Sequence, residues 1–223
     1  SAVVAMMAQL QDDPVNTCAI GFDVKQFDET DYAQTVAKRY STNHFEKQVA
    51  SEDFGLLDTL ASLYDEPYAD RSAIPTYRVC ELAKRRVTVA LSGDGGDEHF
   101  AGYRRYRWHM NEEKLRAIMP LGLRRPLFGA LGRLYPKADW APRFLRAKTT
   151  FQALARDTAS AWAHSVSRMS DEDRARLYSA RLHSDLGGYH GSEVMRRHAA
   201  NAPTDDPLSL AQYLDFKTFL VAV

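Results

Sequence analysis

The residues best suited to chemistry lie in the stretch GDGGDE, residues 93–98. Its glycines allow backbone N–H groups to come close to a ligand and to form a nest that binds an anion. Asp94, Asp97 and Glu98 add carboxylates, which would repel a bare phosphate chain. A divalent cation between carboxylates and phosphates removes that conflict, and Mg²⁺ prefers such oxygen ligands. The spacing therefore favours a site for magnesium and a nucleotide, or for a substrate with a cationic group.

A purely structural interpretation of this turn is also open. Asp94 can cap the N-terminus of a helix, and Asp97 can interact favourably with the helix dipole. Turns rich in glycine and aspartate are common. The spacing alone is thus compatible with a polar turn between a strand and a helix.

The turn follows the run VTVALS, residues 87–92, whose β-branched side chains predict a strand. Earlier strands are predicted at 16–22 and 43–50, with helices in between. This alternation indicates an α/β fold in which crossover helices connect the strands of a parallel sheet. Ligands of such sheets bind beyond the carboxyl ends of the strands, where the acidic turn would lie.

Helical spacing of apolar residues defines the remaining elements. In the first half it predicts helices over residues 1–10, 27–41, 51–65 and 73–86. From about residue 110 the segments have helical spacing and no convincing strand. Ser170 with Asp173 and, further on, Asp206 before Pro207 predict helix starts there. We therefore expect an α/β part, 1–110, and a mostly helical part of the same domain, 111–223.

Composition restricts the class of partner. Lysine plus arginine and aspartate plus glutamate number 29 each, so the net charge is zero and favours neither nucleic acid nor an anionic membrane. Cys18 and Cys80 lie in apolar runs without metal-site spacing, which suits core residues in a reducing compartment. No apolar stretch reaches the roughly 18 residues of a membrane span. We expect a cytoplasmic protein that acts on small molecules.

The run YRRYRWH, residues 103–109, interleaves arginines with aromatic residues. Such a run can stack on nucleic-acid bases, but a helix with a basic outer face and an aromatic inner face gives the same pattern. With zero net charge, the helix is the preferred interpretation. His44 and His99 lack partners at metal-ligand spacing, so an oxygen-based magnesium site is expected instead.

Several segments resemble the glutamine-dependent asparagine synthetases. LSGDGGDE followed by FAGYRRY is similar to the second nucleotide-site motif of their carboxyl-terminal ATP-pyrophosphatase, or synthetase, domain. Upstream, IGFDVKQFDETDYAQTVAKRYSTNHFE and LYDEPYADRSAIPTY resemble the family in order, as does LAQYLDFKTFL downstream. The resemblance implies a Rossmann-like parallel sheet of the adenine-nucleotide alpha-hydrolase type.

The resemblance also implies roles for the matching residues. Asp97 would hold Mg²⁺ on the pyrophosphate, and Asp94 would face the amino acid or its acyl-adenylate; both are candidate catalytic residues. Arg71 and Glu98 are candidate substrate contacts, although Arg71 equally suits a surface salt bridge. The nucleotide would lie against Ile20, Gly21, Ser92, Gly93, Gly95 and Gly96.

The implied reaction is ATP-dependent amide formation. MgATP would adenylate the side-chain carboxylate of aspartate with release of pyrophosphate, and ammonia would then give asparagine and AMP. A glutaminase domain, absent from these residues, would supply the ammonia, and a homodimer is possible. Two alternatives remain: an amidotransferase for another carboxylate acceptor, and a non-catalytic homologue that binds nucleotide.

Departures from the family pattern bear on activity. The family's S-G-G-x-D-S loop would precede Ser1 and its K-V-D-R lysine would follow Val223, so we expect a fragment of a longer protein that is inactive alone. His99 and Ala101 stand where the family commonly has Leu and Gly.

Overall fold

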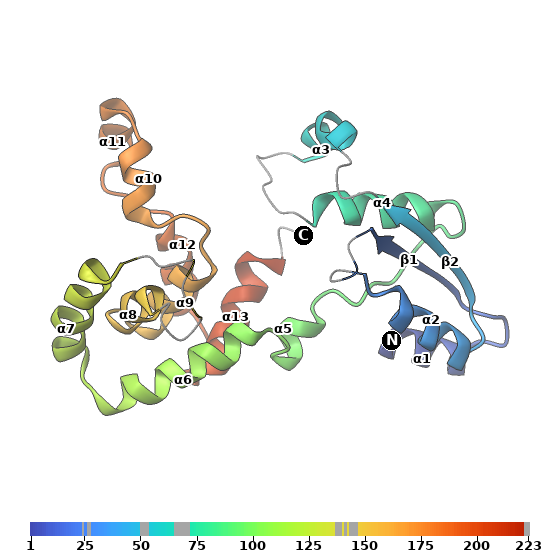
Figure 1. Ribbon diagram of the computed structural model, residues 1–223, viewed down its shortest axis with the longest axis horizontal. Helices are drawn as coiled ribbons and strands as arrows, with labels where there is room; N and C mark the ends of the chain where they lie inside the picture. The colour runs from blue at the N-terminus through green and yellow to red at the C-terminus, as the bar shows by residue number, and fades with distance from the viewer. Residues whose placement is uncertain are drawn as a thin grey trace. The chain divides into compact units, whose positions relative to one another are not determined.

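The computed structural model divides into two compact units, Ser1–Gly93 and Asp94–Val223 (Figure 1). It describes residues 1–23, 25, 28–49, 54–64, 72–136, 140, 142 and 147–220. The predicted parts, a nucleotide-binding part, 1–110, and a helical part, 111–223, were defined by their roles. The two units are defined by compactness, so the predicted division stays a prediction.

The first unit is α/β. Its elements are α1 (Ala2–Leu10), β1 (Asn16–Phe22), α2 (Thr30–Arg39), β2 (Asn43–Val49), the 3₁₀ turn η1 (Phe54–Leu56), α3 (Leu57–Leu63) and α4 (Ala73–Lys84). β1 and β2 pair in parallel with Asn16 opposite Asn43 and Phe22 opposite Val49. The strands predicted at 16–22 and 43–50 and the alternation with helices are thereby confirmed.

Contacts from β2 show how the helices cover the two strands. Glu46 accepts a hydrogen bond from Gln34 of α2, whereas the next residue, Lys47, pairs with Glu81 of α4 at 2.8 Å. Because successive side chains of a strand point to opposite faces, α2 and α4 must lie on opposite sides of the sheet. Figure 1 shows this arrangement. The small sheet is therefore covered on both faces, as parallel sheets are.

The predicted strand at 87–92 is wrong. In the described residues the sheet has two strands, β1 and β2, and 87–92 has no regular structure. Val89 and Leu91 are 78% and 68% exposed. A strand is stabilised by ladder hydrogen bonds and by burial, and β-branched residues alone supply neither. Cys80 is likewise exposed rather than in the core, while Cys18 is half-buried.

The described part of the second unit is helical, as predicted for the second half of the chain. Its elements are α5 (Gly96–Phe100), α6 (Arg104–Ile118), α7 (Leu121–Leu134), α8 (Lys148–Leu154), α9 (Thr158–Val166), α10 (Asp171–Leu177), α11 (Ala180–Leu186), α12 (Ser192–Ala200) and α13 (Pro207–Thr218). The Ser170 hydroxyl accepts from the Asp173 N–H at 3.1 Å, and the Asp206 carboxylate accepts from the Ser209 N–H at 2.8 Å. Both predicted helix starts are thus confirmed.

The core of the second unit is built around a buried carboxylate. Asp215 of α13 is 1% exposed. Its oxygens accept hydrogen bonds from Tyr106 at 2.7 Å and from Trp162 and Arg105 at 2.9 Å each. The Tyr106 and Trp162 rings stack with centroids 5.0 Å apart. Helices α6, α9 and α13 are therefore joined by one polar centre inside an apolar cluster.

Two buried arginines attach α8 to its neighbours. Arg116 of α6 bonds Glu112 and Glu113 of its own helix and donates to the carbonyl of Ala153. Arg124 of α7 donates to the carbonyls of Leu154 and, at 3.0 Å, of Arg156. These bonds add side-chain donors to the carbonyls at and just after the end of α8.

The run 103–109 forms the beginning of α6. It shows the expected basic outer face and aromatic inner face only in part. Tyr106 and His109 point inward and Arg107 outward, as an amphipathic helix requires. Arg105, however, turns toward Asp215, and Trp108 is 68% exposed.

Among the described residues, no helix is long and apolar enough to span a membrane.

His109 is buried against the edge of Trp162, with ring centroids 5.1 Å apart. Its Nε2 has no hydrogen-bond partner and lies 3.8 Å from a Glu113 oxygen. Burial lowers the pKa of His109 to about 4, with a further contribution from the Arg116 charge that Glu113 opposes. The imidazole is therefore neutral in the folded protein at pH 7.

We expect Asp215→Ala to destabilise the second unit by about 3–5 kcal/mol, because it leaves the buried donors of Tyr106 and Trp162 and the half-buried Arg105 guanidinium without their acceptor. Urea unfolding followed by tryptophan fluorescence measures the change. Asp205→Ala, at an exposed position beside the cap of α13, is the matched control and should shift stability by less than about 0.5 kcal/mol. Equal effects of the two substitutions would contradict a central role for Asp215.

Stability should also depend on His109 below neutral pH. The folded-state pKa lies below the ordinary histidine value of 6.5, so the unfolded chain binds a proton that the folded chain excludes. The contribution is present above pH 6.5 and is lost as pH falls toward about 4. Urea midpoints at pH 7 and pH 5 should differ less in His109→Gln than in the parent. His190→Gln, at an exposed site, should behave like the parent.

Candidate functional site

The acidic turn enters helix α5 through a left-handed glycine. Asp94 and Gly95 form the turn, and Gly95 has φ +84° and stands at the N-cap of α5. The N-cap residue is Gly95, so the alternative that places Asp94 at the N-cap is wrong. Gly95 takes that position because a residue without a Cβ adopts positive φ at no steric cost.

Helix α13 holds this turn in place. The side-chain amide of Gln212 donates to the carbonyls of Glu98 at 2.6 Å and His99 at 2.9 Å. His99 also packs on Phe216, with ring centroids 4.5 Å apart. Leu220 lies 3.3 Å from the point where a Cβ on Gly95 would be. A helix of five residues, such as α5, has few internal hydrogen bonds and is unstable by itself. These contacts supply the stability that it lacks.

Asp97 presents its carboxylate beside Gly102. A Cβ on Gly102 would lie 2.0 Å from Oδ1 of Asp97, so the missing side chain makes room for the carboxylate. The carbonyl of Asp97 accepts the Gly102 N–H at 2.8 Å, which ends α5 and fixes the two residues against each other. Asp97 itself is exposed to solvent. It is therefore accessible to a cation or a ligand from solvent.

Glu98 occupies a different environment. It is 2% exposed and hydrogen-bonded to Tyr103. Burial, that hydrogen bond, and the charges of Glu98 and Asp97 raise the pKa of Tyr103 to about 12. The phenol is thus a hydrogen-bond donor at all ordinary pH values. In this structure Glu98 supports the turn from inside, and a substrate contact by Glu98 stays a prediction.

The other predicted nucleotide residues belong to the first unit. Ile20 lies in β1 and lines a hollow of about 450 Å³ between α1, α2 and β1. The side chain of Gln48 lies over Gly21, since a Cβ there would be 2.2 Å from its Nε2. That side chain is flexible and can be displaced by a ligand. Ser92 and Gly93 are exposed at the end of this unit.

The predicted site thus has residues in both units, with Ile20 to Gly93 in the first and the acidic turn in the second. Their assembly into one site stays a prediction, and Arg71 lies outside the described residues. At Gly93 and Gly96, an added Cβ would meet no atom within 4 Å, in contrast with Gly95. These two glycines leave open space beside the backbone, which a ligand-binding turn requires.

The described residues contain no cluster of three or more His, Cys, Asp or Glu side chains suited to hold a metal. His44 instead bonds Thr17 at 2.8 Å and Glu46 at 2.9 Å, and His99 packs on Phe216. A histidine-based metal site is therefore absent from this part of the chain. Asp97 can still contribute to Mg²⁺ binding, because Mg²⁺ takes one or two carboxylates and obtains its other ligands from phosphates and water.

Sequence reasoning identified the turn but missed the residues that position it. Gln212 and Asp215 lie in the segment LAQYLDFKTFL, whose resemblance to the family carries no role for either side chain. Asp215 is a charged residue among the apolar positions of a predicted helix. That pattern was the available signal that its side chain has a structural role.

The comparisons with known proteins concern the family of the chain. The family model described as asparagine synthase matches residues 1–223. A putative glutamine-hydrolyzing asparagine synthetase 2 of Methanocaldococcus jannaschii is 42% identical over 123 residues, which cover 54% of this chain and 23% of that protein. The glutamine-hydrolyzing asparagine synthetase 1 of Bacillus subtilis is 34% identical over 128 residues, or 57% and 20%. The matched region thus spans about a quarter or less of these relatives, and no solved structure matches the chain.

Substitution of Gly95 or of Gly96 by alanine should have different effects on the stability of the protein. Gly95→Ala forces a Cβ into positive φ and against Leu220, and should cost about 1–2 kcal/mol of stability. Gly96→Ala meets no neighbour at a helical position and should be neutral or stabilising by up to about 1 kcal/mol. Urea unfolding of the pair tests this. A larger loss for Gly96→Ala than for Gly95→Ala would contradict the described turn.

Proposed function

Because the chain belongs to the asparagine synthase family, we propose that it forms the ATP-dependent synthetase part of a glutamine-hydrolysing asparagine synthetase. The names of the matched relatives and the order of the motifs support this proposal. The structural observation that carries it is the acidic turn: a rigidly held, glycine-rich helix start that leaves open space at Gly96 and keeps Asp97 accessible.

The proposed first step activates a carboxylate. An oxygen of the aspartate side chain attacks the α-phosphorus of ATP, the bond from that phosphorus to the β-phosphate oxygen breaks, and pyrophosphate leaves with the electron pair. Backbone N–H groups near Gly95 and Gly96 would bind phosphate oxygens, and Ile20 and Gly21 with Ser92 would enclose the adenosine. The fold holding them would be of the ATP-pyrophosphatase type. The chain contributes mainly position and charge neutralisation.

The second step forms the amide. Ammonia attacks the acyl carbon of the adenylate, the bond from that carbon to the phosphate oxygen breaks, and AMP leaves while the nitrogen loses a proton. AMP is a good leaving group where carboxylate oxygen is a poor one, which is why activation comes first. Asp94 would face the bound amino acid, and its charge suits an α-ammonium group.

Asp97 fits a role as magnesium ligand. Its carboxylate is accessible, is fixed beside Gly102, and belongs to the turn that would bind phosphates. Bound Mg²⁺ would neutralise charge on the pyrophosphate as it leaves. No second carboxylate is required, because phosphate oxygens and water complete the coordination.

The test is aspartate-dependent exchange of labelled pyrophosphate into ATP by the full-length protein. We expect exchange in the parent and its loss by on the order of 10²-fold in Asp97→Asn, the size typical of removing one charge-stabilising group. Asp205→Asn is the matched control and should keep the parent rate.

The outcomes separate the alternatives. Exchange without added aspartate, or with another carboxylate only, would assign the activation chemistry to a different acceptor. Binding of ATP with no exchange for any acceptor would indicate a non-catalytic homologue. The 223-residue chain by itself is expected to be inactive, and turnover by that segment would contradict this expectation.

A further inference from the structure

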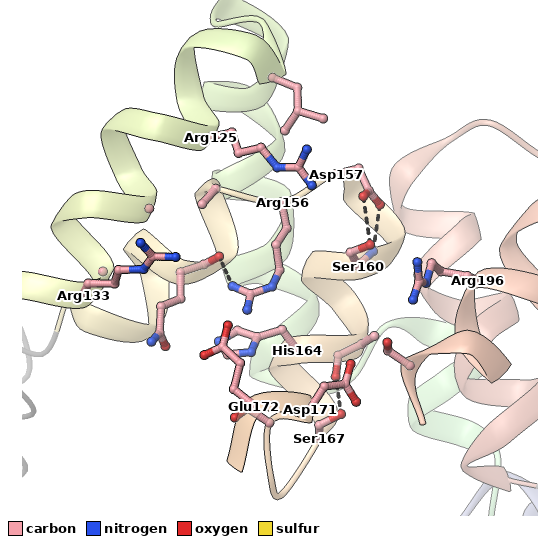
Figure 2. Close-up of a pocket in the computed structure, with 18 of the residues that line it drawn as sticks. Arg125, Arg133, Arg156, Asp157, Ser160, His164, Ser167, Asp171, Glu172 and Arg196 are labelled. Carbon is pink, nitrogen blue, oxygen red and sulfur yellow. Dashed lines mark hydrogen bonds between the residues drawn. The ribbon is translucent and has the colours of Figure 1, made fainter. Parts of the chain in front are cut away.

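A second hollow lies within the helical unit, far along the sequence from the acidic turn. It has a volume of about 500 Å³, is open to solvent on one side, and is lined by α7, α8, α9 and α10 with the start of α12. This volume is within the range of pockets that bind small molecules. Figure 2 shows Arg133 and Arg156 beside the hollow, Arg125 above Arg156, and His164 and Glu172 below it. The function proposed above uses none of these residues.

The arginines of this pocket outnumber the carboxylates available to them. Its charged lining residues are Arg125, Arg133, Arg156, Arg174, Arg196, Asp157, Asp171 and Glu172. Two of the arginines are paired: Arg174 with Asp171, and Arg196 with Glu193. Asp157 is occupied as the N-cap of α9, where it accepts from the N–H and hydroxyl of Ser160 at 2.9 and 2.8 Å.

The three remaining arginines are Arg125, Arg133 and Arg156. Within the described part of the chain, Arg125 and Arg133 form no ion pair. Arg156 donates to the backbone carbonyl of Gln152, which is uncharged. Burial lowers the pKa of Arg156, and the surrounding carboxylates, led by Glu172, oppose this effect only in part. Arg125 and Arg133 are exposed and Arg156 is half-buried, so three cations border one hollow, and an external anion bound there would reduce their mutual repulsion.

The walls of the pocket favour a compact ligand. Gly129 and Gly132 form part of the α7 wall, and no atom lies within 4 Å of a Cβ built on Gly129. His164 has a pKa lowered by burial and by the Arg156 charge, so it offers a neutral hydrogen-bonding ring at pH 7. Guanidinium groups bind phosphate and carboxylate oxygens through paired N–H donors.

We propose that this pocket, here called the arginine pocket, binds a small multivalent oxyanion through Arg125, Arg133 and Arg156. The open volume accommodates a group the size of a diphosphate, and three guanidinium groups match its charge. The site is independent of the acidic turn, so the proposal does not rest on the synthetase function.

Protection from an arginine reagent tests the proposal residue by residue. The protein is treated with phenylglyoxal with and without pyrophosphate, at constant ionic strength and without Mg²⁺, and modification is mapped by peptide mass. Pyrophosphate should slow modification of Arg125 and Arg133 several-fold. Arg104 and Arg107, which are exposed on α6 outside the pocket, serve as internal controls and should react equally in both conditions.

Paired variants provide the binding measurement. Arg125→Gln with Arg133→Gln removes two exposed side chains that form no ion pair with the described residues, so the fold should persist. Calorimetric titration with pyrophosphate should show several-fold weaker binding in this variant, and Arg104→Gln with Arg107→Gln should bind like the parent. Equal binding by both variants, or equal protection of all four arginines, would overturn the proposal. Because modification is mapped by residue, the protection result does not depend on whether the acidic turn binds ATP.

Discussion

The helical unit depends on one buried carboxylate. Removing a carboxylate from water costs several kcal/mol, and Asp215 recovers this cost only while all of its donors remain in place. Arg105 and Tyr106 reach it from α6 and Trp162 reaches it from α9. The geometry of three helices is therefore set by a single side chain, since a shift of any one of them would leave a buried group unpaired.

Because Asp215 fixes α13, it also fixes the residues of α13 that contact the acidic turn. Gln212 and Phe216 lie about one helical turn or less from Asp215, and these neighbours hold the carbonyls of α5 and the ring of His99. On the other side of the turn, Tyr103 bonds Glu98 immediately before α6 begins. The turn is thus fixed at both ends by elements that Asp215 orients, and Asp97 stays accessible on a rigid support.

Local signals were sufficient for much of the fold. β1 follows from its apolar run and β2 from its weak alternation of apolar and polar residues. The starts of α10 and α13 follow from Ser170 and Asp206, because capping involves residues three positions apart. The strand predicted at 87–92 failed because pairing and burial come from distant parts of a chain. Asp215, Arg116 and Arg124 were not predicted to be buried, since a charged residue is normally at the surface unless a partner far away in sequence accepts it. For the candidate site, the residue types of 93–98 located the turn, and the resemblance to the family assigned roles to its residues. The contacts that α13 makes with the turn were visible only in the structure.

The exposed run at 87–91 has a consequence for the protein in solution. VTVAL is uncharged, rich in β-branched residues and free of proline, and Val89 and Leu91 offer their side chains to solvent. An uncovered segment of this kind is a template on which another chain can add a strand, so it favours self-association and amyloid-like stacking. Arg85 and Arg86 before it and Asp94 after it act as gatekeepers, because like charges repel when identical segments come into register. The charges at the two ends of this run thus oppose the self-association that the run itself favours.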